Sequence, residues 1–359
     1  MEVSLIYDLS LSELASLLVA WGEPAYRARQ IWRGLYRNFW KTPEEFTNLP
    51  VSLRKKLTES LLFNNLVPVT TLRSSDGETL KTLFRLQDGK AVETVLMKYD
   101  PSVAVHQAHR DHPGQGRRTV CISTQVGCAM GCVFCATGQM GFKRHLSSGE
   151  IVAQVMYFAR QLLSQGEVIT NVVVMGMGEP FHNYENTMSA IDRLNDRGGY
   201  NFGARRITIS TVGLVPAIRR FAAEKRQVNL AISLHAANDE LRDSMLPINK
   251  SYPIDELLAA CREFIAITGR RITFEWALVD GVNDTPEQAQ LLARKLKGML
   301  CHVNAIPLNP TYGYSGLATT RKHAQEFKEV LSRFGIPCTV RLRRGMDIHA
   351  GCGQLVSEY

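Results

Sequence analysis

The sequence predicts an α/β fold, a partial (β/α)6 barrel preceded by a small helical domain. From residue 119 onward, short apolar segments rich in β-branched residues alternate with longer amphipathic segments. Repeated strand–helix units of this kind form a parallel sheet with right-handed crossovers. The pattern supplies six units and a closing strand, fewer than the eight of a full barrel. Helical periodicity before residue 66 predicts the additional domain.

Four segments follow from these patterns. We expect a helical accessory domain at 1–66, a connecting β segment at 67–106, the barrel at 107–349, and a short tail at 350–359.

In the first segment, Ser10 and Glu13 have the spacing of a capping box, which predicts a helix that begins at residue 11. A second helix is predicted from residue 25. Thr42, Pro43 and Glu45 have the positions of the cap, first turn and N3 residue of a third helix.

A basic face is predicted on the second helix, because Arg29, Arg33 and Arg37 are four residues apart. The aromatic residues beside this face are Trp32, Tyr36 and Trp40. Basic and aromatic side chains together are typical of a nucleic-acid surface. A solvated cationic face over a small core is the alternative.

Residues 67–99 alternate like paired strands, with a turn at 75–77. The next stretch, 100–118, is rich in Pro, Gly, His and Arg and contains His106, His109 and His112. Spaced histidines can bind a metal, but the chain breakers favour a loop, whose role the sequence does not reveal.

The barrel strands are predicted at 119–123, 171–175, 206–210, 229–233, 272–278, 303–307 and 339–342, and two of the longer helices at 149–163 and 286–296. In barrels of this kind the chemistry takes place at the C-terminal ends of the strands.

Composition narrows the choice of function. Lys and Arg total 42 against 34 Asp and Glu, and the pI is about 9.1, which fits a polyanionic partner. No apolar run is long enough to cross a bilayer and the N-terminus does not resemble a signal peptide, so we expect no membrane association and a cytoplasmic protein. In such a protein, clustered cysteines bind metal or do chemistry more often than they form disulfides.

Cys128, Cys132 and Cys135 lie in one short loop after the first barrel strand. Three thiolates on one 4Fe–4S cluster leave one iron without a protein ligand, which is typical of a catalytic site. The alternative is a zinc site completed by a distant cysteine or histidine, but zinc usually takes paired C-x-x-C arms and the sequence has no second arm.

This C-x-x-x-C-x-x-C pattern resembles that of the radical S-adenosylmethionine superfamily. The surrounding motifs at 121–128 (CISTQVGC), 135–144 (CATGQMGFKR), 176–180 (GMGEP) and 347–355 (DIHAGCGQL) resemble its RlmN/Cfr family, and within it the dual-specificity RNA methyltransferases. The likeness covers nearly the whole chain, with the loop near 106–116 as an addition.

The resemblance implies an enzyme that methylates C2 of adenine 2503 in 23S rRNA and of adenine 37 in some tRNAs. It implies one 4Fe–4S cluster, two S-adenosylmethionine molecules per turnover, an external electron donor and a disulfide reductant. It assigns S-adenosylmethionine binding to Gly178, Glu179, Ser210, Ser233, Leu234, His235 and Asn309.

The same resemblance makes Cys352 the methyl carrier, Cys121 its resolving partner and Glu93 the proton acceptor. Cys352 lies between two glycines in the tail, where packing does not explain a buried cysteine. By contrast, Cys261, Cys301 and Cys338 read as small core residues.

Two other functions remain open at this point. A Cfr-like enzyme would methylate C8 of the same rRNA adenine. A non-catalytic RNA-binding metal protein would need the basic face but neither Cys352 nor S-adenosylmethionine. The sequence does not fix the preferred RNA, the reductants or the oligomeric state.

Overall fold

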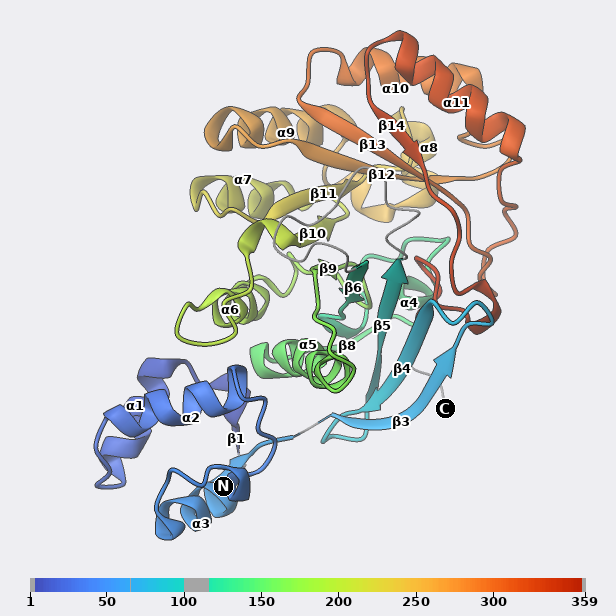
Figure 1. Cartoon of the computed structure of the whole chain (residues 1–359). Coiled ribbons are helices and arrows are strands. Elements are labelled where there is room, and N and C mark those ends of the chain that lie inside the picture. The colour runs from blue at the N-terminus through green and yellow to red at the C-terminus, as the bar shows by residue number, and fades with distance from the viewer. Residues whose placement is uncertain (1–3, 65, 100–115, 357–359) are drawn as a thin grey trace.

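A ten-stranded mixed sheet organises the chain (Figure 1). The structure, a computed structural model, describes residues 4–64, 66–99 and 116–356. The strand order is β14-β13-β12-β11-β10-β9-β6-β5-β4-β3. Pairing is parallel from β14 to β6 and antiparallel from β6 to β3. The parallel part is the partial (β/α) barrel that the sequence predicts.

The parallel strands are β6 (Arg117–Cys121), β9 (Asn171–Val174), β10 (Ile207–Thr211), β11 (Asn229–Ser233), β12 (Ile272–Leu278), β13 (Cys301–Pro307) and β14 (Cys338–Val340). All seven were predicted, and β11 and β12 match at both ends. The middle residues of β11 are all buried and apolar, β9 and β10 alternate between buried and half-buried residues, and the residues of the edge strand β14 are half-buried or exposed.

The main helices between the strands are α5 (Ser148–Leu163), α6 (Tyr184–Asn195), α7 (Val215–Ala223), α9 (Ile254–Thr268), α10 (Pro286–Leu296) and α11 (Arg321–Arg333). They cover the outer face of the sheet (Figure 1). Ser147 and Glu150 form a capping box at the start of α5, and the Thr285 side chain caps α10. Two shorter helices, α4 (Ala136–Gln139) and α8 (Asp239–Met245), and a hairpin of β7 (Gln125–Gly127) and β8 (Phe142–His145) complete the barrel.

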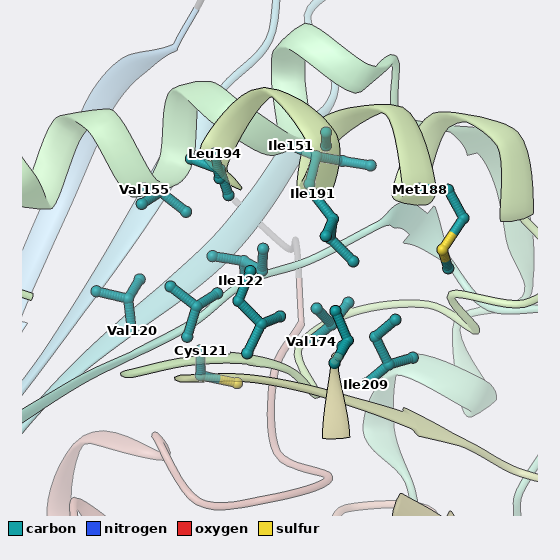
Figure 2. Packing of buried hydrophobic residues seen from close by; sticks show 14 of the residues in the cluster. Val120, Cys121, Ile122, Ile151, Val155, Val174, Met188, Ile191, Leu194 and Ile209 are labelled. Atoms are coloured by element: carbon teal, nitrogen blue, oxygen red, sulfur yellow. The ribbon is translucent and has the colours of Figure 1, made fainter. Parts of the chain in front are cut away.

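The core between helices and sheet leaves the other face of the strands free for a site. Figure 2 shows Ile151 and Ile191, from α5 and α6, packed toward Ile122 and neighbouring side chains at the strands. Successive residues of a strand point to opposite faces. Cys121 therefore lies on the face of β6 opposite to Val120, away from the helices (Figure 2).

The predicted connecting segment extends the barrel sheet. It forms β3 (Val67–Arg73), β4 (Thr79–Arg85) and β5 (Ala91–Tyr99), and β5 pairs with β6. The predicted turn is present, with Gly77 N donating to Ser74 O at 2.8 Å. The three loop histidines, at 106, 109 and 112, lie outside the described residues.

The N-terminal segment contains α1 (Leu11–Ala20), α2 (Tyr26–Tyr36), α3 (Val51–Ser60) and a short parallel pair, β1 (Ser4–Leu5) with β2 (Leu61–Leu62). The capping box of Ser10 and Glu13 is confirmed. The third start signal was wrong: Thr42 precedes only a 3-10 turn, Pro43–Glu45, and its side chain makes no capping bond. The helix itself begins at Val51.

The aromatic half of the predicted basic face is also wrong. Trp32 and Tyr36 are buried and contact each other with ring centroids 4.5 Å apart, so they are core residues. Arg37 donates to the backbone carbonyls of Arg197 and Gly199, which lie beyond α6. Of the three arginines, Arg29 and Arg33 remain exposed without such a tie.

The N-terminal helices dock on α5 and α6 through backbone contacts. The Asp8 carboxylate accepts from the Gly149 amide at 2.6 Å and the Ser148 hydroxyl at 3.1 Å. A Cβ at position 149 would lie 2.7 Å from the Asp8 nitrogen, so this contact requires glycine. None of the helices in the described part of the chain is long and apolar enough to span a membrane.

Candidate active site

A cavity of about 280 Å³ opens at the C-terminal ends of the parallel strands and reaches into the barrel. The predicted site residues that line it are Cys121, Cys132, Cys135, Gly178, Glu179, Ser210, Ser233, His235, Asn309 and Cys352. Cys128, Glu93 and Leu234 do not line it. The Leu234 side chain belongs to the hydrophobic core, so only its backbone is oriented toward site residues.

The cysteine loop is shaped by close backbone packing. Gly127 has φ +72°, and a Cβ there would lie 1.8 Å from the Gly141 carbonyl oxygen. The Cys128 amide donates to this same carbonyl at 3.0 Å, which fixes the start of the loop. Cys135 then begins α4, with its amide bonded to Cys132 O at 3.1 Å. These contacts hold the three predicted ligands on one side of the cavity.

The donor set fits an iron–sulfur cluster better than a single metal ion. A tetrahedral ion brings its sulfur ligands within about 4 Å of one another, given metal–sulfur bonds of ~2.3 Å. Within the described chain, the three cysteines are not among the donor groups that lie within 4.8 Å of one another. Burial raises the pKa of Cys128 to about 12 and also raises that of Cys132 and Cys135. Near neutral pH these three cysteines are therefore expected to be thiolates only when a metal cation binds them.

Gly176 and Gly178 follow β9, and both lie against neighbouring segments of the chain. A Cβ on Gly176 would lie 2.7 Å from Ile122 O, and one on Gly178 would lie 2.5 Å from Gln125 Cβ. Gly178 also has φ +100°, which favours glycine. The glycines thus allow neighbouring strands to pack closely, and this packing positions Glu179.

Glu179 is a buried carboxylate held by backbone amides. It accepts from Phe181 N at 3.0 Å and from Val212 N at 2.9 Å. Burial raises its pKa to about 7, although these amide bonds lower it. No cationic side chain pairs with it within the described residues. A ligand ammonium group would supply the missing positive charge.

Ser210 and Ser233 end two neighbouring strands, and their hydroxyl oxygens are 3.4 Å apart. His235 follows with φ +59°. Its Nδ1 accepts from the Ala277 amide at 2.8 Å, which leaves the proton on Nε2. Burial lowers the pKa of His235 to about 3, so the ring is neutral near pH 7. Together these residues offer hydroxyl and N–H groups at the cavity wall.

The C-terminal tail reaches the cavity and is held there by hydrogen bonds. Asn309 Nδ2 donates to Cys352 O at 3.0 Å, and Ala136 N donates to Gly353 O at 2.7 Å. Asn309 Oδ1 is buried without a hydrogen-bond partner and is free to accept from a ligand. The Thr137 hydroxyl donates to Leu355 O at 2.7 Å. The tail is therefore fixed from both the cysteine loop and the end of β13.

Cys121 and Cys352 face the same cavity from distant parts of the sequence. Both thiols are free. Burial and, second, the charge of Cys352 raise the pKa of Cys121, so the two sulfurs are within electrostatic range. The exposed surface of Cys352 faces the cavity, and burial of the thiol raises its pKa to about 12.

Comparisons with known proteins agree with this geometry. Residues 122–293 match the model of the Radical SAM superfamily, and residues 5–62 match that of the ribosomal RNA large subunit methyltransferase N-terminal domain. The chain is 49% identical over 350 residues to "Dual-specificity RNA methyltransferase RlmN 1" of Myxococcus xanthus, covering 98% of this chain and 93% of that protein.

The chain belongs to the RlmN family. A probable dual-specificity RlmN of Chloroflexus aurantiacus is 47% identical, with 100% and 94% coverage. A crystal structure of a radical SAM methyltransferase from Sphaerobacter thermophilus superposes with a TM-score of 0.93 at 52% identity, over 99% of this chain and 100% of that one. RlmN enzymes are radical S-adenosylmethionine methyltransferases, and membership implies a 4Fe–4S cluster and S-adenosylmethionine.

Glu93, the proton acceptor expected in an RlmN enzyme, lies beside the cavity rather than in its wall. Its Oε1 pairs with Lys81 Nζ at 2.8 Å, and its Oε2 accepts from Val356 N at 2.9 Å. Lys81 also donates to His349 O at 3.3 Å. Burial raises the pKa of Glu93 although Lys81 lowers it. The pair thus binds the tail on both sides of Cys352.

Three further residues of this RlmN-family cavity were missed in the sequence. Glu275 on β12, Asn304 on β13 and Arg341 after β14 line it and form one hydrogen-bonded chain. The available signal was Glu275 itself, a single acid within the apolar strand 272–278. A charged residue at a core position is rare unless it is paired or functional.

Proposed function

We propose that this RlmN-family enzyme methylates C2 of adenine in RNA, at adenine 2503 of 23S rRNA and at adenine 37 of some tRNAs. One observation carries the proposal: Cys121 and Cys352 line the same cavity as the residues expected to bind the cluster and S-adenosylmethionine. The RNA substrates are supported by the relatives, which are named as rRNA methyltransferases and dual-specificity RNA methyltransferases.

In this proposal, Cys128, Cys132 and Cys135 hold the cluster. Glu179 accepts from the methionine ammonium group. The other predicted cofactor residues that line the cavity make the remaining contacts, namely Gly178, Ser210, Ser233, His235 and Asn309, and Leu234 contributes through its backbone. When bound, the cluster and S-adenosylmethionine supply an adenosyl radical that abstracts hydrogen. An external donor provides the electron, and two S-adenosylmethionine molecules are used per turnover.

Cys352 acts as the methyl carrier. C2 of adenine is an electron-poor amidine carbon, so a methyl cation does not transfer to it directly. Instead the Cys352 thiolate takes a methyl group by displacement and, after loss of one hydrogen atom, forms a carbon–carbon bond to C2. The product of this step is a thioether that joins Cys352 to the RNA.

Cys121 releases the product. Its thiolate attacks the Cys352 sulfur and the carbon–sulfur bond breaks. The released carbon takes up a proton to become the methyl group, a base removes the C2 proton, and the unpaired electron left by the addition returns to the external one-electron carrier. The result is methylated RNA and a Cys121–Cys352 disulfide, which an external dithiol reduces. Glu93 is the proposed proton acceptor, and its ion pair with Lys81 keeps a carboxylate close to the tail.

The decisive test is nucleoside mass spectrometry of a target hairpin after incubation with anaerobically reconstituted enzyme. We expect 2-methyladenosine. A product that co-elutes with 8-methyladenosine would favour the Cfr-like alternative, and RNA binding without any methylated product would favour a non-catalytic metal protein.

Substitution of the cysteines separates their proposed roles. Cys352→Ala should form no adduct, whereas Cys121→Ala should accumulate enzyme joined covalently to RNA, visible on denaturing gels. Cys261→Ala is the matched control, because this thiol is buried in α9 outside the cavity. Repeated turnover by Cys121→Ala without an adduct would exclude the two-cysteine scheme.

A further inference from the structure

Glu275 is a buried carboxylate that lacks a full set of partners. Its side chain lines the cavity, yet the residue is only 7% exposed. Oε2 accepts from Asn304 Nδ2 at 2.5 Å, and Oε1 accepts no hydrogen bond from the described residues. Neither does a cationic side chain pair with it in this part of the structure. A buried charge with one oxygen unsatisfied is costly, which points to a ligand that donates to it.

Arg341 supplies a donor beside this acceptor. Its Nε donates to Asn304 Oδ1 at 2.8 Å, and no hydrogen bond within the described chain engages its terminal nitrogens. Asn304 therefore holds both groups at once, with its amide N–H on Glu275 and its carbonyl on Arg341. The cavity wall here presents an acceptor and a donor side by side.

This pair lies next to the methyl carrier. The charges of Glu275 and Arg341 both act on the Cys352 thiol, raising and lowering its pKa respectively. Glu275 pairs in register with Asn304 in the neighbouring strand, so the two groups are fixed by the sheet. A ligand held by Glu275 and Arg341 is thus placed against Cys352.

We propose that Glu275 and Arg341, aligned by Asn304, bind the N6–N1 edge of the target adenine in RNA. The N6 amino group donates to Glu275, and N1 accepts from Arg341. This inference rests on the proposed function and deepens it, because it names the atoms by which the RNA base is recognised.

Regiochemistry follows from the same contacts. C2 is bonded to N1, whereas C8 lies in the other ring at the far end of the purine. A base whose N6–N1 edge meets Glu275 and Arg341 therefore brings C2 to Cys352 and keeps C8 away. The pair explains why this cavity favours methylation at C2.

S-adenosylmethionine also contains adenine, so the source of the base must be decided. Six of the seven residues expected to bind that cofactor are at the ends of β9, β10 and β11, and the seventh, Asn309, follows β13. Glu275 in β12 pairs in register with Ser233 of β11, and Arg341 follows β14, so the pair extends from the expected cofactor residues toward the edge of the sheet. The target carbon must reach Cys352, which lines the same cavity as the pair, so we assign the pair to the RNA base.

The electrostatics of Glu275 agree with this role. Burial raises its pKa to about 7, although Arg341 and Asn304 lower it. A ligand N–H directed at the free oxygen would favour the carboxylate. Removing that N–H from the ligand should leave the oxygen unsatisfied, which weakens binding.

The test compares three hairpins that carry adenine, purine without the N6 amino group, or 1-deazaadenine at the target position. Equilibrium binding and kcat/KM are measured with the reconstituted holoenzyme. The unsubstituted enzyme should prefer adenine over each analogue by roughly 10–100-fold. Glu275→Leu should abolish the preference over purine, and Arg341→Met the preference over 1-deazaadenine.

Glu275→Gln provides a signature that a general base would not give. In this variant Asn304 Nδ2 still donates to the oxygen of the new side-chain amide. The NH2 group of that amide therefore faces the base, and the preference for adenine over purine should vanish or reverse. Arg341→Met changes an exposed side chain and keeps the test decisive if Glu275→Leu does not fold.

Unchanged preferences in these variants would overturn the inference. So would loss of the S-methyl group on Cys352 in Glu275→Leu, measured by peptide mass mapping, because it would assign Glu275 to S-adenosylmethionine. If the unsubstituted enzyme shows the binding preference but forms no methylated adenine, the proposed function fails while the recognition of adenine stands.

Discussion

Two buried glutamates, one beside the cavity and one in its wall, have different partners. Glu93, on β5, is 5% exposed and has both oxygens engaged, by Lys81 and by the tail amide of Val356. Glu275, on β12, is 7% exposed and has one oxygen engaged, by Asn304. Within the described residues, Glu93 has a lysine in direct contact, whereas Glu275 forms no ion pair and Arg341 acts on its charge only from a distance.

This difference indicates that Glu93 positions the tail, whereas Glu275 is available to bind a ligand. A buried carboxylate with a lysine and an amide already satisfied has little left to offer a ligand, so its contacts position the tail. A buried carboxylate with a free oxygen destabilises the empty site and gains from a donor. Unpaired polar groups thus indicate where the ligand binds.

Removing Lys81 takes away the ion-pair partner of Glu93 and should have the largest effect on the free energy of unfolding. Lys81→Met leaves Glu93 buried without a cation and also removes the bond to His349 O. We expect the free energy of unfolding at pH 8 to fall by about 3–5 kcal/mol. Urea unfolding of the double variant Lys81→Met/Glu93→Gln is the control, since a neutral pair should recover most of the loss; no recovery would contradict the ion-pair account.

Glu275→Gln should change how the free energy of unfolding depends on pH. The folded pKa of Glu275 is about 7 because of burial, against an ordinary value of 4.5. A raised carboxyl pKa means that stability is fully present below about pH 4.5 and is lost as the pH rises through 7. The variant should therefore gain up to about 3 kcal/mol over the unsubstituted protein between these pH values. Parallel pH profiles of the two unfolding free energies would contradict this.

A single tail anchor should matter less. Thr137→Val preserves shape but removes the hydroxyl that bonds to Leu355 O. We expect a loss of about 1 kcal/mol in unfolding free energy and faster alkylation of Cys352 by iodoacetamide, since the tail is held less firmly. Cys352 alkylation at an unchanged rate would show that the other bonds are sufficient.

The smallest effect is expected at the partly buried ion pairs that connect Glu167 to β5 and β6. Glu167 bonds to Arg118 and Lys98, and Arg118 lowers its pKa to about 2. A lowered pKa gives stability above about pH 4.5 that is lost as the pH falls toward 2. Glu167→Gln should cost at most about 1 kcal/mol at pH 7 and flatten the acid unfolding curve. A loss as large as that of Lys81→Met would contradict the distinction between fully buried and partly buried pairs.

The parallel strands were predictable because each is a short apolar run followed by an amphipathic helix. The Lys81–Glu93 pair was not, since it depends on the register of β4 and β5. Leu83 lies opposite Glu93 and Lys81 opposite Val95, which makes the two charged residues diagonal neighbours. Register is set by the assembled sheet, and the alternation of each strand alone does not reveal it.

In the N-terminal domain, helical spacing predicted that the arginines share one face. It did not predict that the aromatic residues lie in the core. Trp32 and Tyr36 are amphipathic rings that suit either a surface or an interior. Their burial follows from docking on α6, where a Cβ at Gly199 would lie 2.7 Å from Trp32 Nε1. That contact joins residues far apart in the sequence.

The cysteine loop and the strand-end residues of the site were found from motifs, and most of them line the cavity. Glu275, Asn304 and Arg341 were missed because each belongs to a different strand region and carries no local motif. Only the pairing of β12, β13 and β14 in the assembled sheet brings an acid, an amide and a guanidinium into one row.

The continuity of the sheet also bears on folding. The β3–β4–β5 meander has local contacts, whereas each parallel strand pairs across a crossover helix, so we expect the meander to form first. Cys121 lies in the first parallel strand and Cys352 in the tail after the last one. The cavity that both thiols line therefore exists only in the folded barrel.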